Sequence, residues 1–300
     1  VLQFLPGDGA TVGGRAVADP RVAGVAFTGS TETARLINRT LAGRDAAIGT
    51  LIAETGGQNA MFVDSSALPE QVVQDAAFSA FNSAGQRCSA LRLLCLQTDI
   101  ADRVIELLAG HMEELVVGNP ALLETDVGPA IDEEARGMLE THVRQMEEKA
   151  KVLCRCSLGD GTKSGTFFAP TLIEIDSVDV LEREVFGPVL HLLRFRSRDL
   201  HATIDAVNAT GYGLTMGLHS RIDSRARKLV EQSCAGNIYV NRNMIGAVVG
   251  VQPFGGRGLS GTGPKAGGPH YLPRFGTEYS VSNNIAAVGG NASLLSLEND

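Results

Sequence analysis

Residues 78–92, FSAFNSAGQRCSALR, are the stretch from which the rest of the chain is interpreted. The pattern predicts the end of a helix, a glycine turn, the cysteine Cys88 and then an apolar strand over 91–96. A cysteine on a glycine loop between packed elements is fixed but accessible, as a thiol nucleophile must be, and the adjacent charge of Arg87 would favour the thiolate. The alternative is a buried structural cysteine, because free cysteines are among the most buried residues.

Two strands upstream of this loop end in polar residues. Residues 22–28 (VAGVAFT) read as a strand that runs into Gly29-Ser30 and a helical pattern. This order points backbone N–H groups at a phosphate, although a plain helix cap at Ser30 explains it equally well. A second strand, 48–53, ends at Glu54-Thr55-Gly56-Gly57. Glu54 could serve as a general base if burial raised its pKa; the alternative is a solvated turn glutamate.

Strand and helix patterns alternate through the rest of the chain. The predicted helices are 69–84, 100–115, 131–151, 200–208 and 225–232, and the predicted strands are 59–63, 167–175, 190–195 and 236–241. This alternation predicts an α/β fold with mainly parallel sheets. The glycine-rich stretch 246–268 shows no pattern of its own, and a loop of that length is usually functional.

Composition narrows the function classes. The 300 residues predict two packed units. The 44% hydrophobic and 20% charged content is typical of a globular protein, and the net charge of −8 argues against nucleic-acid binding. No apolar run approaches the roughly 20 residues of a membrane span. The five cysteines are odd in number and lack metal-site spacing, so we expect free thiols, no metal and a cytoplasmic location.

Seven short motifs occur in the order and at the spacing of the aldehyde dehydrogenase superfamily, which the chain resembles over nearly its whole length. They are residues 27–30 (FTGS), 54–57 (ETGG), 85–88 (GQRC), 118–120 (GNP), 184–188 (EVFGP), 208 with 212–214 (N and YGL), and 253–256 (PFGG). The resemblance implies that Cys88 is the nucleophile that forms a thioester. It also implies that Glu54 is the base that activates water, and that the Cys88 N–H helps to form the oxyanion hole.

The resemblance further implies NAD as the cofactor. Gly29 and Ser30 would lie near its pyrophosphate, and Glu184 would hold the nicotinamide ribose with Phe186 beside it. The implied cofactor-binding set also contains Thr28, Thr55 and Gly56. FAD is expected only in a separate proline dehydrogenase domain.

Within the superfamily the chain resembles the L-glutamate γ-semialdehyde (Δ1-pyrroline-5-carboxylate) dehydrogenase branch of proline catabolism, as found in bifunctional bacterial proline-utilisation proteins. That branch implies that Ser89 and the N–H groups of Gly246 and Ala247 hold the substrate's α-carboxylate, with Phe254 on its aliphatic chain. Arg87 completes the implied substrate set. An ordinary flexible turn is the alternative for Gly246-Ala247.

The resemblance also implies the organisation of the chain. Residues 1–56 would end a Rossmann-type NAD domain, 57–255 would form an α/β catalytic domain, and 256–300 would hold a closing segment, an oligomerisation arm and a tail, of which 284–297 resemble the branch's terminus. The family's first strands, its lysine on the adenosine ribose and its oxyanion-hole asparagine have no counterpart here. We therefore expect a C-terminal piece of an enzyme, inactive alone. The whole protein would carry a proline dehydrogenase domain upstream, form homo-oligomers and lie in the cytoplasm or peripherally at the membrane.

Two alternatives remain open. Another semialdehyde or aliphatic aldehyde dehydrogenase would use the same Cys88 and Glu54 but would need no carboxylate site at Gly246-Ala247. A catalytically silent scaffold or oligomerisation fragment would need neither residue. The presence of both Cys88 and Glu54 favours an enzyme.

Overall fold

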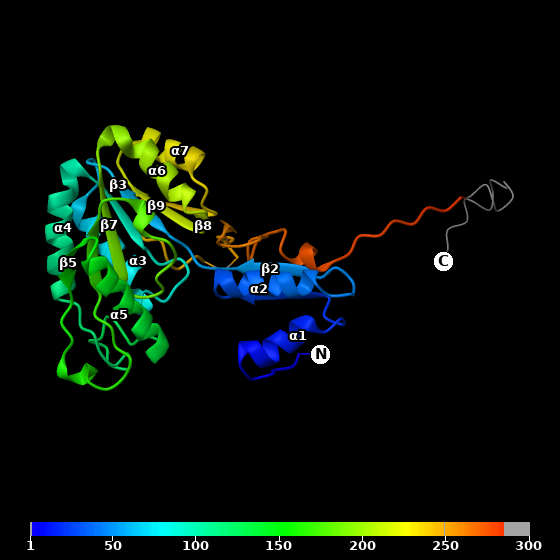
Figure 1. Ribbon diagram of the computed structural model, residues 1–300. Helices are drawn as coiled ribbons and strands as arrows, with labels where there is room; N and C mark the ends of the chain where they lie inside the picture. Colours follow the sequence, from blue (N-terminus) through cyan, green and yellow to red (C-terminus); the bar gives the residue numbers. More distant parts are fainter. Residues whose placement is uncertain (1, 249, 285–300) are drawn as a thin grey trace.

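A seven-stranded sheet forms the larger part of the computed structural model, which describes residues 2–248 and 250–284 (Figure 1). The strand order is β10-β9-β3-β4-β7-β6-β5, and every pair is parallel except β5 with β6. The expectation of a mainly parallel α/β fold is thus confirmed. The strands are β3 (Ala60–Val63), β4 (Leu93–Gln97), β5 (Lys151–Arg155), β6 (Thr171–Ile175), β7 (Val189–Phe195), β9 (Thr215–His219) and β10 (Asn237–Val240).

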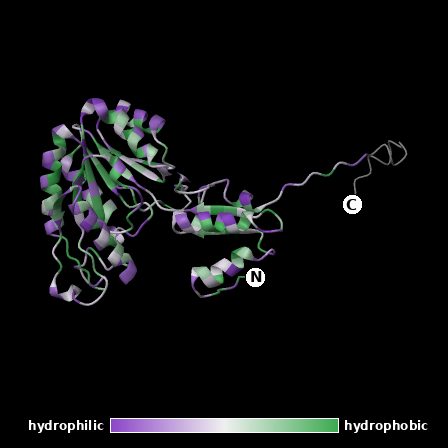
Figure 2. Ribbon diagram, viewed as in Figure 1, coloured by the Kyte–Doolittle hydropathy of each residue, from purple (hydrophilic) through white to green (hydrophobic). Residues whose placement is uncertain are grey.

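Helices cover both faces of this sheet. Met61 and Val63 pack in one core cluster with α3 (Pro69–Phe81) and α4 (Thr98–Glu113). The intervening side chains of β3 point the other way, since successive strand residues alternate between faces. Those residues pack in a second cluster with helices α5 (Glu133–Glu147), α6 (Leu200–Ala209) and α7 (Asp223–Gln232). A parallel sheet buried on both faces needs apolar strands, and Figure 2 shows the strands green between helices with purple outer faces.

A smaller βαβ unit lies beside the main sheet (Figure 1). Its parallel strands β1 (Gly24–Thr28) and β2 (Thr50–Glu54) are joined by α2 (Thr31–Ala42). Thr28 pairs with Glu54 in the register, so the two polar strand ends predicted from sequence lie next to each other. A short π-helical segment (Gly9–Gly13) and α1 (Gly14–Ala18) precede this unit.

The glycine-rich segment that follows β10 contacts both the small unit and the main part of the fold. In its described part it forms one strand of two residues, β11 (Arg257–Gly258), which pairs antiparallel with β8 (Tyr212–Gly213). Single bridges join Gly261 to Glu54 at the end of β2 and Ala266 to Phe254. The segment therefore lies across the junction of the small unit and the main sheet, and the expectation that it has little regular structure is confirmed.

Some predicted elements were wrong in extent or missed. The helix predicted over 131–151 ends at Glu147, because the chain turns at Ala150 and enters the edge strand β5. The strand predicted over 167–175 begins only at Thr171. Strand β9 was missed, since its five residues follow directly on a glycine turn and are all buried, which leaves no alternating pattern.

Five short 3-10 segments complete the described elements: Asn82–Gly85, Asp160–Thr162, Val178–Val180, Ser197–Asp199 and Leu272–Phe275. No helix in the described part of the chain is both long enough and apolar enough to cross a membrane. Most of the tail predicted at 284–297 lies outside the described residues.

Candidate active site

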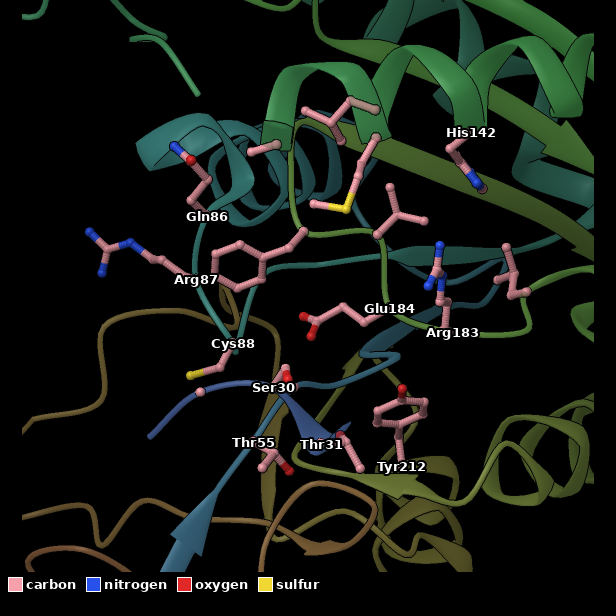
Figure 3. Close-up of a pocket in the computed structure, with 18 of the residues that line it drawn as sticks. Ser30, Thr31, Thr55, Gln86, Arg87, Cys88, His142, Arg183, Glu184 and Tyr212 are labelled. Carbon is pink, nitrogen blue, oxygen red and sulfur yellow. The ribbon is translucent and has the colours of Figure 1, made fainter. Parts of the chain in front are cut away.

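One cavity of about 1580 Å³ lies where the small unit, the main sheet and the glycine-rich segment meet. Every residue that the sequence predicted as catalytic, cofactor-binding or substrate-binding lines it. These are Thr28, Gly29, Ser30, Glu54, Thr55, Gly56, Arg87, Cys88, Ser89, Glu184, Phe186, Gly246, Ala247 and Phe254. Figure 3 shows Cys88, Ser30, Thr55 and Glu184 grouped around it.

The loop that carries Cys88 begins with a strained turn. After α3 ends, Ser83, Ala84 and Gly85 all adopt left-handed backbone conformations, with φ of 56°, 53° and 64°. Only glycine fits the third position, because a Cβ there would lie 2.3 Å from the carbonyl oxygen of Gly187. Strain of this kind persists where the surrounding structure holds it, and it often marks functional sites.

Asn59 fixes the main chain of the same loop. Its side-chain amide donates to the carbonyl oxygens of Cys88 (2.7 Å) and Ala90 (2.9 Å) and accepts from the backbone N–H of Thr215 (3.0 Å). Asn59 is 1% exposed, and its bonds to Ala90 and Thr215 are buried, while the bond to Cys88 is partly buried. The cysteine loop is therefore attached to the starts of both β3 and β9.

Cys88 is partly buried and lies among negative charges. Burial, and then the carboxylates of Glu184 and Glu54, raise the pKa of its thiol, which the Ser89 N–H partly offsets. The prediction that Arg87 favours the thiolate is wrong, because its exposed guanidinium donates to the Ser83 hydroxyl (3.1 Å) and points away from Cys88 (Figure 3). Buried cysteines do exist in this chain, but they are Cys95, in the middle of the sheet, and Cys156.

Glu54 stands at the end of β2 against the glycine-rich segment. Burial raises the pKa of its carboxyl to about 7, although the Gly256 N–H and the charge of Lys265 act in the opposite direction. Oε2 accepts the Gly256 N–H at 3.3 Å, while Oε1 is buried and has no hydrogen-bond partner among the described residues. A Cβ at Gly255 would lie 2.5 Å from Oε1, so only glycine allows this approach. Glu54 is thus not the solvated turn glutamate of the alternative interpretation.

Arg92 is a buried cation that sequence reasoning missed. It is 1% exposed, and its guanidinium donates to the carbonyl oxygens of Gly187 (2.9 Å) and Arg87 (3.1 Å) and pairs with Glu184 Oε1 (3.2 Å). The same group lies 5.4 Å from the ring centroid of Phe186. Arg92 therefore joins the cysteine loop to the segment that carries Glu184 and Phe186. A lone arginine inside the apolar run 91–96 was the available signal.

Glu184 projects from that segment toward the cysteine loop (Figure 3). Burial raises the pKa of its carboxyl, and the charge of Arg92 and the N–H of Gly57 partly offset this shift. A Cβ at Gly56 would lie 1.7 Å from Glu184 Oε2. The first glycine after Glu54 thus leaves room for a second carboxylate, whereas a Cβ at Gly57 would meet the side chain of Asn59.

The N-terminus of α2 opens into the same cavity. Ser30 caps the helix, its hydroxyl accepting the Thr33 N–H at 3.1 Å, and Thr31 Oγ1 donates to the Leu259 carbonyl at 2.9 Å. The plain capping interpretation is therefore correct for the Ser30 side chain. The uncapped N–H groups and the positive end of a 12-residue helix remain suited to a phosphate.

The predicted substrate residues lie on two neighbouring loops. Ser89 is 7% exposed beside Cys88. Gly246 has φ of +75°, which favours glycine, and the backbone N–H groups of Gly246 and Ala247 have no hydrogen-bond partner within 2–248 and 250–284. Phe254 lines the cavity from the glycine-rich segment. Two adjacent N–H groups without partners among the described residues could bind an anion.

Comparison with known proteins agrees with this geometry. The aldehyde dehydrogenase family matches residues 1–280. The chain is 56% identical over 283 residues to bifunctional protein PutA of Escherichia coli K12, covering 92% of this chain and 21% of that protein. It is 36% identical over 277 residues to 1-pyrroline-5-carboxylate dehydrogenase of Geobacillus thermodenitrificans, covering 91% and 53%.

A solved 1-pyrroline-5-carboxylate dehydrogenase from Thermus with bound NAD superposes with a TM-score of 0.83 at 34% identity, covering 91% of this chain and 53% of that one. The chain thus spans about half the length of the dehydrogenases and about a fifth of PutA. Because the family match extends over nearly all of the described sequence and the shared fold brings the matched residues to one cavity, the chain belongs to the aldehyde dehydrogenase family.

Proposed function

We propose that this chain supplies the catalytic part of an NAD-dependent dehydrogenase that oxidises L-glutamate γ-semialdehyde to L-glutamate. The observation that carries the proposal is the joint presence, in one cavity, of the Cys88 thiol and the Glu54 carboxyl with its pKa of about 7. The names of its relatives, 1-pyrroline-5-carboxylate dehydrogenase and bifunctional PutA, support it.

Cys88 acts as the nucleophile in this proposal. Its sulfur, as thiolate, bonds to the aldehyde carbon, and the aldehyde oxygen becomes an oxyanion that the Cys88 N–H stabilises. The oxyanion then reforms the carbonyl as hydride leaves the carbon, and Cys88 is left as a thioester. NAD, when bound, supplies the acceptor for that hydride.

Glu54 acts in the second half of the reaction. Its carboxylate takes a proton from water, and the resulting hydroxide adds to the thioester carbon. The C–S bond breaks, the acid is released and Cys88 leaves as thiolate. A base with a pKa near the working pH is well matched to this step, because it is largely ionised and still basic enough to accept the proton.

The residues present fit NAD. The N-terminus of α2, with Gly29 and Ser30, offers N–H groups to a pyrophosphate. Glu184 Oε1 is held by Arg92, which orients the carboxylate so that its remaining acceptor capacity can bind ribose hydroxyls. Phe186 is 46% exposed beside it and offers an apolar face to the nicotinamide ring. Thr28, Thr55 and Gly56 complete this wall of the cavity.

The substrate assignment depends on the turn at Gly246-Ala247. Its two unpaired N–H groups, together with the Ser89 hydroxyl and the nearby Arg87, would receive the α-carboxylate, while Phe254 packs on the aliphatic chain. The second candidate is a dehydrogenase for an uncharged aliphatic aldehyde, which would leave these donors unpaired in the complex. A site built to hydrogen-bond a substrate group discriminates strongly against substrates that lack it.

The test compares kcat/KM for L-glutamate γ-semialdehyde and for propanal in the whole protein. We expect the kcat/KM of the wild type to be roughly 10²–10³-fold higher for the semialdehyde than for propanal. Stronger discrimination is known at sites of this kind, but here water can enter the open loop and bind the N–H groups. Ala247→Pro removes one N–H donor and should lower this preference while sparing propanal. A wild type that prefers propanal, or a substitution that slows both substrates equally, would reject the carboxylate site.

We also propose the wider organisation expected from the sequence. Residues 1–56 would complete an NAD domain, 57–255 would form the catalytic domain, and 256–300 would contribute to self-association. The whole protein would be cytoplasmic or peripheral at the membrane, with an upstream flavin-dependent proline dehydrogenase domain. The name of the relatives, bifunctional protein PutA, supports that link. Flavin absorbance of the whole protein tests the upstream flavin domain, and its mass from light scattering tests self-association. Absence of flavin would reject the first, and a monomeric mass would reject the second.

A further inference from the structure

The segment 241–247, which leads into the proposed carboxylate turn, is fastened to helix α3. Gln71 on α3 donates to the Asn241 carbonyl at 2.9 Å. The backbone N–H of Met244 donates to the Ser79 hydroxyl at 3.0 Å, and that hydroxyl donates in turn to the Asp75 carbonyl at 2.5 Å. The bonds of Asn241 and Met244 to α3 connect residues at least 165 positions apart in sequence, so they attach the segment to a different element.

A buried ionisable pair lies below the same segment. His219 Nε2 lies 3.4 Å from Asp75 Oδ2, and neither atom has a hydrogen-bond partner among the described residues. The His219 ring is also hydrogen-bonded to the main chain of Arg242, whose guanidinium lies 5.1 Å from the ring centroid of Tyr239. The His219 side chain is 1% exposed and the Asp75 side chain is 15% exposed, so the histidine is buried and the carboxylate partly buried. The pair therefore connects α3, the end of β9 and the start of the segment.

These contacts stop just before the two N–H groups. Met244 is 0% exposed and Ile245 is 3% exposed, whereas Gly246 is exposed and turns the chain with φ of +75°. The direction of the Gly246 and Ala247 N–H groups thus depends on how the preceding residues are held. Among the described residues, the bond from the Met244 N–H to the Ser79 hydroxyl is the last polar contact of the segment before the turn.

We propose that Ser79 and Gln71 are positioning residues for substrate specificity: beside the Asp75–His219 pair, they hold the 241–247 segment so that its N–H groups converge on a carboxylate of the substrate. The inference rests on the proposed function and deepens it. Neither residue lines the cavity, so both act through the turn and touch no reacting atom. A donor displaced by about 1 Å loses up to roughly 100-fold in rate where the interaction matters.

The experiment uses Ser79→Ala in the whole protein. The substitution leaves the Met244 N–H without an acceptor, and we expect the kcat/KM preference for L-glutamate γ-semialdehyde over propanal to fall by about 10- to 100-fold. The lower preference should result mainly from a higher KM for the semialdehyde. The kcat/KM for propanal should not change. Affinity for the product L-glutamate, measured by calorimetry, should fall in parallel.

Two further variants control this test. Thr203→Ala removes a similar contact, since Thr203 Oγ1 donates at 2.9 Å to the carbonyl of Asp199, the residue that precedes α6. Thr203 does not line the cavity. This substitution should leave the preference unchanged. Gln71→Ala removes the exposed bond to Asn241, so it tests the same idea on a surface residue if Ser79→Ala does not fold. It should also lower the preference.

The outcomes separate the two proposals. A wild type that prefers propanal overturns the carboxylate site and, with it, the role of these residues. The positioning role alone is overturned if the wild type prefers the semialdehyde and neither Ser79→Ala nor Gln71→Ala changes that preference. This includes the case in which a variant slows both substrates equally. A selective loss in either variant, absent in Thr203→Ala, supports the positioning role.

Discussion

Release of the acid product should depend on pH through Glu54. The pKa of this carboxyl is about 7 because burial disfavours its charged form. Only the carboxylate can accept a proton from water, so the step is lost as pH falls through 7. From a pKa of about 7, the ionised fraction is about nine tenths at pH 8 and about one tenth at pH 6, which predicts a roughly tenfold fall in deacylation-limited turnover.

The contribution of Glu54 to folding stability should change with pH in the direction opposite to its contribution to activity. A carboxyl whose pKa is higher in the folded than in the unfolded chain contributes stability that is present below about pH 4.5 and is lost as pH rises through about 7. Activity and the contribution of this group to folding therefore oppose each other near neutrality. This opposition is expected of a functional group that is held in a partly buried position.

The assay is rapid-quench or stopped-flow measurement of NADH in the whole protein between pH 6 and 8. Glu54→Gln should keep an NADH burst near one equivalent per site and slow steady turnover by about 10²–10⁴-fold. The remaining turnover of this variant should not fall as the pH decreases through 7. Glu106→Gln is the matched control, since Glu106 is exposed on α4 and pairs only with Arg103 in the described structure.

Glu54 would not be the base if steady turnover of the wild type did not change between pH 6 and 8. The same conclusion would follow if the fall in turnover near pH 7 persisted in Glu54→Gln. Loss of the burst together with turnover would assign Glu54 to acylation or to folding instead. The raised pKa of the Cys88 thiol also makes acylation faster at higher pH, so the burst rate and the steady rate must be measured separately.

Three further substitutions test the rest of the site. Cys88→Ser should abolish NADH production, because a hydroxyl supplies no thiolate, and substantial turnover would remove Cys88 from the mechanism. Glu184→Ala should lower kcat by roughly 100-fold through misplaced nicotinamide, and unchanged kcat and NAD affinity would discard that role. Arg92→Met leaves Glu184 buried without its partner, which should lower the free energy of unfolding by about 3–5 kcal/mol in urea titrations and reduce the burst; an unchanged midpoint would contradict it.

Much of this protein could be predicted from local sequence. The alternation of apolar strands with amphipathic helices specifies the α/β fold, because a strand repeats every two residues and a helix every 3.6. Glu54, at the end of β2, and Cys88, on the loop between α3 and β4, are signalled by neighbouring glycines within a few residues. Those signals concern the backbone next to each residue, so they survive without knowledge of the fold.

The electrostatics of the site were decided only by the tertiary structure. Arg87 is next to Cys88 in sequence, yet its side chain turns away, and Glu184, 96 positions further along, is the larger charge effect on the thiol. Arg92 is buried against Glu184 by the packing of two loops. The pKa of Glu54 depends on the segment that folds back over it from residue 255 onward. Burial and charge proximity arise from contacts between distant residues, and a local pattern contains neither.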